Sequence, residues 1–128
     1  MATNTLQQIE THLQFLGYAI SHEDDRTVAR HPTKYNMLIK PFVGGFLFTT
    51  FFGCTDLAKR NRLGYLNLVN TLNAKATVAR YYVDKDSDLV AEAWHFSEYE
   101  RTAFGIFMDA LDRDHRVMSA SDAEDYIA

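Results

Sequence analysis

The 128-residue sequence predicts an α+β fold, in which an antiparallel sheet carries helices at the start, middle and end of the chain. The expected order is helix, four strands, helix, two strands, helix. Apolar residues recur at helical spacing in three segments and alternate in the segments between them. Polar or glycine-containing turns join neighbouring extended segments, which favours hairpins over parallel crossovers. The length suits a single domain, here 1–128.

The first helix is predicted from about Thr5 to Leu16. Four apolar side chains share one face of this helix: Leu6, Ile9, Leu13 and Leu16. Asn4 or Thr5 can cap its start, and Gly17 can end it. Phe15 falls on the opposite face, so we expect it to lie outside the core.

The extended segments are predicted as three hairpins: 18–22 with 27–31, 35–42 with 46–52, and 77–83 with 89–96. The second hairpin is expected to reverse at Gly44 and Gly45, because glycine tolerates the positive φ of a tight turn. Large apolar side chains occupy both faces of the segment 46–52: Phe46, Phe48 and Phe52 on one, Leu47 and Phe51 on the other. We therefore expect this strand to be central in the sheet or covered on both sides.

The middle helix is predicted from Leu57 to about Leu72, after a cap at Thr55 or Asp56. Six residues fall on its core face: Leu57, Ala58, Tyr65, Leu68, Val69 and Leu72. Its outer face mixes polar residues with Leu63 and Leu66. Exposed leucines are common and often have no role, but they can also mark a contact with a partner.

The last helix is expected to open with a capping box formed by Ser97 and Glu100. Its apolar stripe contains four residues: Phe104, Phe107, Met108 and Leu111. Residues 114–128 are acidic and small, so we expect a flexible tail, or a segment that docks only through Tyr126 and Ile127.

Charge is distributed in blocks along the chain, although the net charge is only -4. Residues 1–25 hold four acids and no base, residues 26–80 hold nine bases and one acid, and residues 81–128 hold four bases and twelve acids. Such blocks favour association with an oppositely charged surface of the same molecule, a second copy or a partner. The alternative is that they neutralise one another within the fold.

No catalytic motif, phosphate-binding loop or cofactor motif is present, so we expect neither an enzyme nor a cofactor. The only cysteine, Cys54, is expected to be structural. His22 and His31 could face each other across the first hairpin, but a third metal ligand is missing. The acidic segment 84–88 lacks the glycine and glutamate of a calcium loop and indicates a hairpin turn. We therefore expect no metal site.

The opening residues lack the basic and apolar regions of a signal peptide, and the longest apolar-looking run is too short to span a membrane. A lone cysteine also argues against a disulfide-stabilised secreted scaffold. We therefore expect a cytoplasmic protein that does not act at a membrane.

Local strings at 16–18 (LGY), 66–70 (LNLVN) and 82–86 (YVDKD), together with the order of elements, resemble the YbjN-like family. The resemblance covers about residues 5–112. It implies a type III secretion chaperone-like fold, commonly homodimeric, with no established catalytic residue. Secretion chaperones of similar fold hold an extended client peptide along hydrophobic patches.

Three functions are compatible with the sequence. The first is a non-enzymatic interaction domain, a homodimer that binds a segment of an unidentified protein on an apolar surface. The candidate partner-binding residues are Phe46, Phe48, Leu63, Leu66, Lys59 and Arg62. The second is a regulatory domain that binds a small ligand in a pocket walled by Trp94 or Tyr81. The third is weak nucleic-acid binding through Lys59, Arg60 and Arg62, which the acidic pI near 5.6 disfavours.

Overall fold

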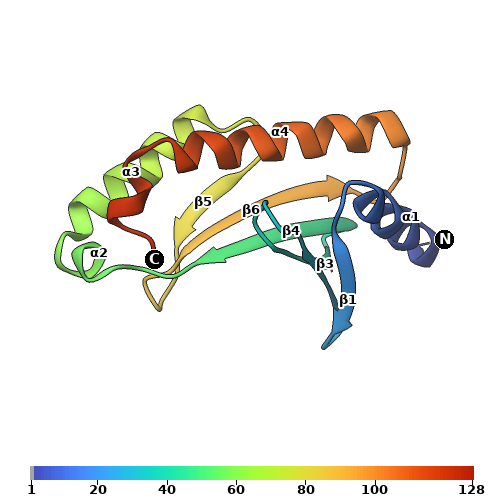
Figure 1. Cartoon of the computed structure of the whole chain (residues 1–128), viewed down its shortest axis with the longest axis horizontal. Coiled ribbons are helices and arrows are strands. Elements are labelled where there is room, and N and C mark those ends of the chain that lie inside the picture. The colour runs from blue at the N-terminus through green and yellow to red at the C-terminus, as the bar shows by residue number, and fades with distance from the viewer. Residues whose placement is uncertain (1) are drawn as a thin grey trace. The chain divides into compact units, whose positions relative to one another are not determined.

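The structure, a computed structural model, describes residues 2–128, with side chains from Thr5 onward. Its helices are Ala2–Phe15 (α1), Asp56–Arg60 (α2), Arg62–Lys75 (α3), Arg101–Ser119 (α4) and the 3-10 helix Asp122–Asp125 (η1). Its strands are Ala19–Glu23 (β1), Arg26–Arg30 (β2), Met37–Phe42 (β3), Gly45–Phe52 (β4), Arg80–Val83 (β5) and Leu89–Phe96 (β6). The strands form one sheet in the order β1-β2-β3-β4-β6-β5 (Figure 1). The α+β fold with three antiparallel hairpins is confirmed.

Contacts divide the described chain into two compact units. The first contains the described residues up to Thr50 together with Trp94–Met108, and the second contains Phe51–Ala93 together with Asp109–Ala128. Each unit has its own buried side chains, with Ile9, Leu13, Ile39, Phe48 and Phe104 in the first and Tyr65, Leu72, Leu89 and Met118 in the second. That one domain spans 1–128 stays a prediction.

The first helix begins at Ala2, so the predicted caps, Asn4 and Thr5, lie inside it. Its other features are as expected. Ile9 and Leu13 are fully buried, and the Phe15 side chain is 79% exposed. Gly17 follows the helix with a φ of 99°, a left-handed conformation that glycine adopts without steric cost.

The β3–β4 turn is shifted by one residue from its predicted place. Val43 and Gly44 have the positive φ values, 48° and 73°, whereas Gly45 lies in β4, paired with Phe42. Only glycine fits at position 45, for a reason unrelated to the turn: a Cβ there would lie 2.6 Å from the Trp94 ring.

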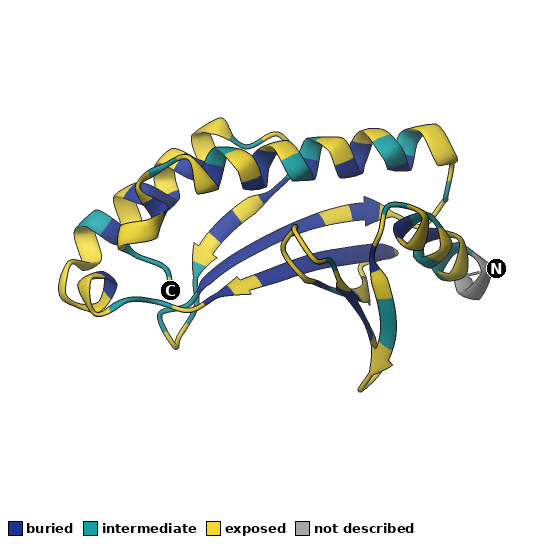
Figure 2. Cartoon of the chain, in the orientation of Figure 1, coloured by how far each residue is buried: buried dark blue, intermediate teal, exposed yellow. Residues whose placement is uncertain are grey.

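Strand β4 is central, as its two apolar faces predicted, because it lies between β3 and β6. Its residues are buried apart from Phe51, which is 54% exposed (Figure 2). In the first unit, the Phe48 ring packs against Phe104 and Phe107 of α4, with centroid distances of 6.0 and 5.2 Å. Alternation then places Phe46 on the side of the strand that faces α4.

The middle helix is broken at Asn61 rather than continuous over 57–72. Asn61 leaves helical geometry, with φ -119° and ψ 70°, and it ends α2 and begins α3. Its side-chain oxygen accepts a hydrogen bond from the Gly64 N–H at 3.0 Å, which caps α3. Thr55 caps α2 as predicted, accepting from the Ala58 N–H. The predicted core residues are buried except Leu57, which lies on α2, before the break, and is 37% exposed.

Helix α4 starts at Arg101, and the predicted capping box does not form. Instead the Glu100 carboxylate accepts from the N–H groups of Thr102 and Ala103, at 2.8 and 3.0 Å. These bonds lower the pKa of Glu100. The apolar stripe predicted for this helix is buried.

The segment 114–128 is folded, in contrast to the predicted flexible tail. Helix α4 continues to Ser119, and Asp114 and Met118 are buried. The Asp114 carboxylate accepts from three consecutive backbone N–H groups, those of Thr77, Val78 and Ala79, at 2.8, 2.8 and 2.9 Å. No local pattern predicts these partners, because they lie more than thirty residues away in the sequence. Tyr126 and Ile127 dock as the alternative expected, but not alone, because Asp125 and Ala128 also form hydrogen bonds and Ala123 is buried.

Candidate interaction surfaces

Four of the six predicted partner-binding residues lie exposed on α2 and α3 in the second unit. We call Lys59, Arg62, Leu63 and Leu66 the α3 surface. Leu63 is 72% exposed and Leu66 is 44% exposed, whereas the opposite side of α3 is buried. The sequence prediction that both leucines point outward is confirmed. The surface combines apolar groups with cationic ones, which is a combination suited to an acidic partner surface.

The helix that carries most of the α3 surface is held in place by contacts of Tyr65 on its buried side. The buried Tyr65 hydroxyl donates to the Ser87 carbonyl at 2.8 Å, and burial raises the pKa of Tyr65 to about 12. The Tyr126 ring stacks on Tyr65 at 5.7 Å with an interplanar angle of 6°. A Cβ at Gly64 would clash with the Tyr126 hydroxyl, so this glycine allows the C-terminal segment to approach α3. Tyr65 lies on α3 itself, and the partners that hold it, Ser87 and Tyr126, are remote in the sequence.

The other two predicted partner-binding residues, Phe46 and Phe48, are 4% and 2% exposed. They fill the core of the first unit and offer no exposed ring to a partner. Exposed apolar groups of this unit lie nearby, at the β3–β4 hairpin. Phe42 is 40% exposed, Val43 is 78% exposed and Trp94 of β6 is 47% exposed, and we call these three residues the hairpin surface.

The hairpin surface is held by one hydrogen bond and one close approach. The Trp94 indole N–H donates to the Phe42 carbonyl at 2.8 Å, and the ring approaches Gly45 so closely that a Cβ there would lie 2.6 Å from it. Val43 is unusual, because a β-branched residue with a φ of 48° is strained. Strained backbone combined with exposed apolar side chains is a feature of recognition sites. Sequence reasoning identified Trp94 only as a pocket wall and missed Phe42 and Val43.

The predicted small-ligand pocket does not form around Tyr81, which is 4% exposed. Its hydroxyl donates to the Asp114 carbonyl at 3.3 Å inside the second unit. A hollow of about 560 Å³ lies elsewhere, in the first unit, between α1 and the start of α4. Its lining residues are Gln7, Gln8, Thr11, His12, Phe15, Tyr99 and Arg101.

The histidine pair considered for a metal is separated. His22 pairs with Thr27, and its ring is 2.8 Å from the Glu10 carboxylate, whereas His31 follows the far end of β2. Within residues 2–128, no three His, Cys, Asp or Glu side chains are grouped to hold a metal ion. Independence from metals stays a prediction: adding Ca²⁺ or Zn²⁺ should leave the melting temperature unchanged.

Cys54 is half-buried and pairs through its backbone with Ile127, which is compatible with a structural role. Lys59, Arg60 and Arg62 are all exposed, so the basic cluster remains available to an anionic partner. Among the described helices even the longest, α4, lacks the continuous apolar length that a membrane crossing requires.

Two solved structures match the fold of this chain over most of its length. The crystal structure of YbjN from E. coli has a TM-score of 0.74 with 14% sequence identity, and the match covers 96% of this chain and 95% of that chain. A chain of the heterodimeric ExoU–SpcU complex, from the type III secretion system of Pseudomonas aeruginosa, has a TM-score of 0.61 with 18% identity, covering 84% and 92%. The TM-scores show a shared fold, and at such low identity they show the fold alone. None of the curated proteins matches the sequence significantly.

A family model provides the assignment. The model described as "YbjN: Putative bacterial sensory transduction regulator" matches residues 5–112. This range runs from α1 into α4 and includes every strand of the sheet. The resemblance predicted from the local strings is confirmed, and the chain belongs to the YbjN family.

Proposed function

We propose that this protein is a non-enzymatic interaction domain that forms a homodimer and binds a segment of another protein on an apolar surface. The observation that carries the proposal is the exposure of Leu63 and Leu66 on a helix whose other side is fully packed. A neighbour in fold belongs to a heterodimeric complex, which supports a role in protein interaction. The family description as a regulator is compatible with the same role.

The α3 surface is the proposed self-association surface. Basic Lys59 and Arg62 flank the two leucines, and the chain's last third carries twelve acids that a second copy could offer to them. Rim charges contribute little affinity but favour one orientation. A symmetric dimer would bury both leucines of each copy, which are 72% and 44% exposed. At about 2 kcal/mol for a fully exposed leucine, the four side chains together would contribute about 4 to 5 kcal/mol, or roughly a thousandfold in Kd.

The hairpin surface is the proposed site for the protein segment. Its three side chains are apolar and lie beside a two-residue turn that holds the β-branched Val43 at a positive φ. An extended segment that covers them would remove apolar area from water at about 25 cal/mol per Å². The two surfaces belong to different units, so their roles can be tested separately.

Self-association is tested by size-exclusion chromatography with light scattering at tens of micromolar. The double variant Leu63→Glu with Leu66→Glu should convert a dimer to a monomer while leaving the far-UV circular dichroism unchanged. Asn67→Glu with Thr71→Glu is the matched control, because it adds the same two charges to exposed positions of α3 without removing apolar area. A wild-type protein that remains monomeric would refute the dimer.

Segment binding is tested by pull-down from native lysate. Phe42→Gln should lose partners that the wild type retains, whereas Lys40→Gln, an exposed change on the same strand, should retain them. Equal recovery with both variants would refute a role for the hairpin surface.

A further inference from the structure

The hollow between α1 and the start of α4 is a built groove that the proposed function does not use. It lies wholly within the first unit and has a volume of about 560 Å³, enough for a small organic molecule or the end of a peptide. One side is a stripe of α1, and the other is formed by Tyr99 and Arg101. The groove combines a cation, a fixed polar pair and an exposed aromatic ring.

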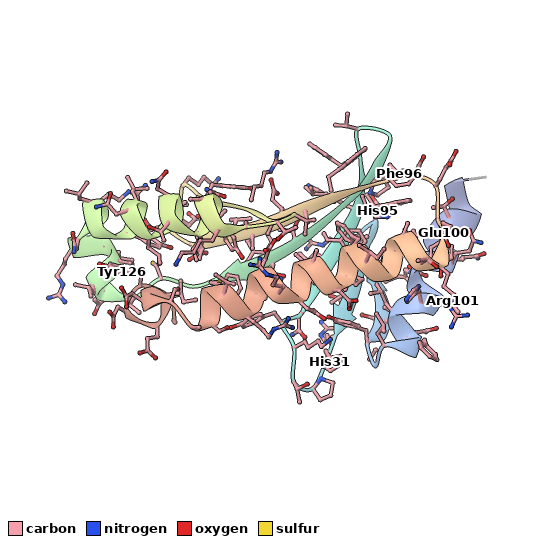
Figure 3. The ribbon with its side chains drawn as sticks, turned by 90° about the horizontal axis from the view of Figure 1, so that it is seen from above. His31, His95, Phe96, Glu100, Arg101 and Tyr126 are labelled. Carbon is pink, nitrogen blue, oxygen red and sulfur yellow. The ribbon has the colours of Figure 1, made fainter. Side chains whose placement is uncertain are left out.

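Arg101 supplies the cation. It is exposed at the first residue of α4, and no acidic side chain in residues 5–128 forms an ion pair with it. The neighbouring Glu100 carboxylate is directed to the backbone N–H groups of Thr102 and Ala103. Figure 3 shows Arg101 beside α1 at this end of the helix. The guanidinium therefore retains its donors for an anion.

His12 and Tyr99 form the fixed polar pair. The His12 Nδ1 atom is 2.8 Å from the Tyr99 hydroxyl, and the imidazole packs edge-on against Phe104 at 5.0 Å. Burial, followed by the charge of Arg101, lowers the pKa of His12, so the ring is neutral at pH 7. The pair defines the groove wall, and the positive charge stays with Arg101.

Phe15 supplies the apolar part. Its side chain is 79% exposed although it is a large aromatic ring, and it lines the same groove. It lies three residues beyond His12 on α1, about 5 Å along the helix axis. A ligand that contacts both the Arg101 end and Phe15 must therefore carry its charge and its apolar group a few bonds apart.

We propose that this groove binds a carboxylate that carries an aromatic or apolar arm. Arg101 would hold the carboxylate through paired N–H donors, and Phe15 would pack against the arm. A free organic acid and the C-terminal residue of a peptide ending in phenylalanine share this chemistry. The groove shares no residue with the α3 surface or the hairpin surface, so its test is independent of the proposed function.

The test is a titration followed by two-dimensional amide NMR, with 3-phenylpropionate and its uncharged analogue 3-phenylpropionamide as probes. The acid should shift the signals of α1 and of residues 99–101, and the amide should bind about tenfold more weakly, as expected for loss of a charged hydrogen-bonding group. A peptide ending in phenylalanine, compared as free acid and as C-terminal amide, forms the second arm. Tighter binding of the peptide acid identifies a protein terminus, and tighter binding of 3-phenylpropionate identifies a free acid.

Variants assign the contacts. Arg101→Gln should remove the preference for acid over amide, Arg101→Lys should retain much of it, and the exposed Arg116→Gln serves as the charge-matched control on α4. Phe15→Ser should weaken both probes, whereas Ile106→Ser, which also removes an exposed apolar side chain, should not. The proposal is overturned if acid and amide bind equally, if neither shifts the groove signals, or if Arg101→Gln behaves like Arg116→Gln.

Discussion

The buried carboxylate of Asp114 should be a principal source of stability in the second unit. Its Oδ1 atom accepts from the Thr77 N–H, and its Oδ2 atom accepts from the N–H groups of Val78 and Ala79. The residue is 2% exposed, so water cannot replace these bonds. Asp114→Asn and Asp114→Ala remove them to different extents.

The magnitudes follow from the number of acceptors lost. Asparagine keeps one oxygen, which can still serve Val78 and Ala79, and places an amide group against the Thr77 N–H. One buried donor without an acceptor, together with the lost charge, should lower the free energy of unfolding by about 2 kcal/mol. Alanine leaves all three donors without a partner and should cost about 4 to 5 kcal/mol. At roughly 4 °C per kcal/mol for a chain of this size, Asp114→Asn should lower Tm by about 8 °C.

Urea unfolding followed by far-UV circular dichroism measures both variants. Asp109→Asn is the control, because Asp109 is an exposed aspartate on the same helix and should change stability by less than about 0.5 kcal/mol. The reasoning is refuted if Asp114→Asn unfolds at the same urea concentration as Asp109→Asn. That result would mean that residues 114–128 behave as the flexible tail predicted from the sequence.

Three further outcomes are expected. Val43→Asn should raise the free energy of unfolding by about 1 kcal/mol, because asparagine tolerates the positive φ of this turn. A lower urea midpoint than that of the wild type would contradict this gain in stability. The same variant should weaken partner binding, because it removes an apolar side chain of the hairpin surface. Burial lowers the pKa of His115 from 6.5, so the unfolded chain binds more protons than the folded one in this pH range. The free energy of unfolding should therefore fall as the pH drops from 7.5 through 6.5 towards the folded-state pKa. A His115→Gln variant should show a smaller change in stability between pH 7.5 and 5.5, and a change equal to that of the wild type would contradict the prediction. Cys54→Ala should fold and retain the binding of the parent in the same pull-down, and loss of binding without loss of stability would assign the thiol a functional role.

Local periodicity was sufficient to predict most of the secondary structure. Large apolar residues on both faces of the segment 46–52 predicted a central strand, and helical spacing predicted that Leu63 and Leu66 point outward from α3. Both features depend only on the backbone period, which the order of apolar and polar residues records directly. The same order predicted that Phe15 lies outside the core.

Features that depend on partners remote in the sequence could be found only in the tertiary structure. Gly45 looked like a turn residue, but the Trp94 ring that covers it comes from β6. Asp114 looked like one more solvated acid, because the backbone donors that surround it belong to residues 77–79. A carboxylate is equally acidic in a tail or in a buried site, and only the fold decides which donors reach it. The groove at Arg101 arises in the same way, since α1 and the start of α4 meet only after folding.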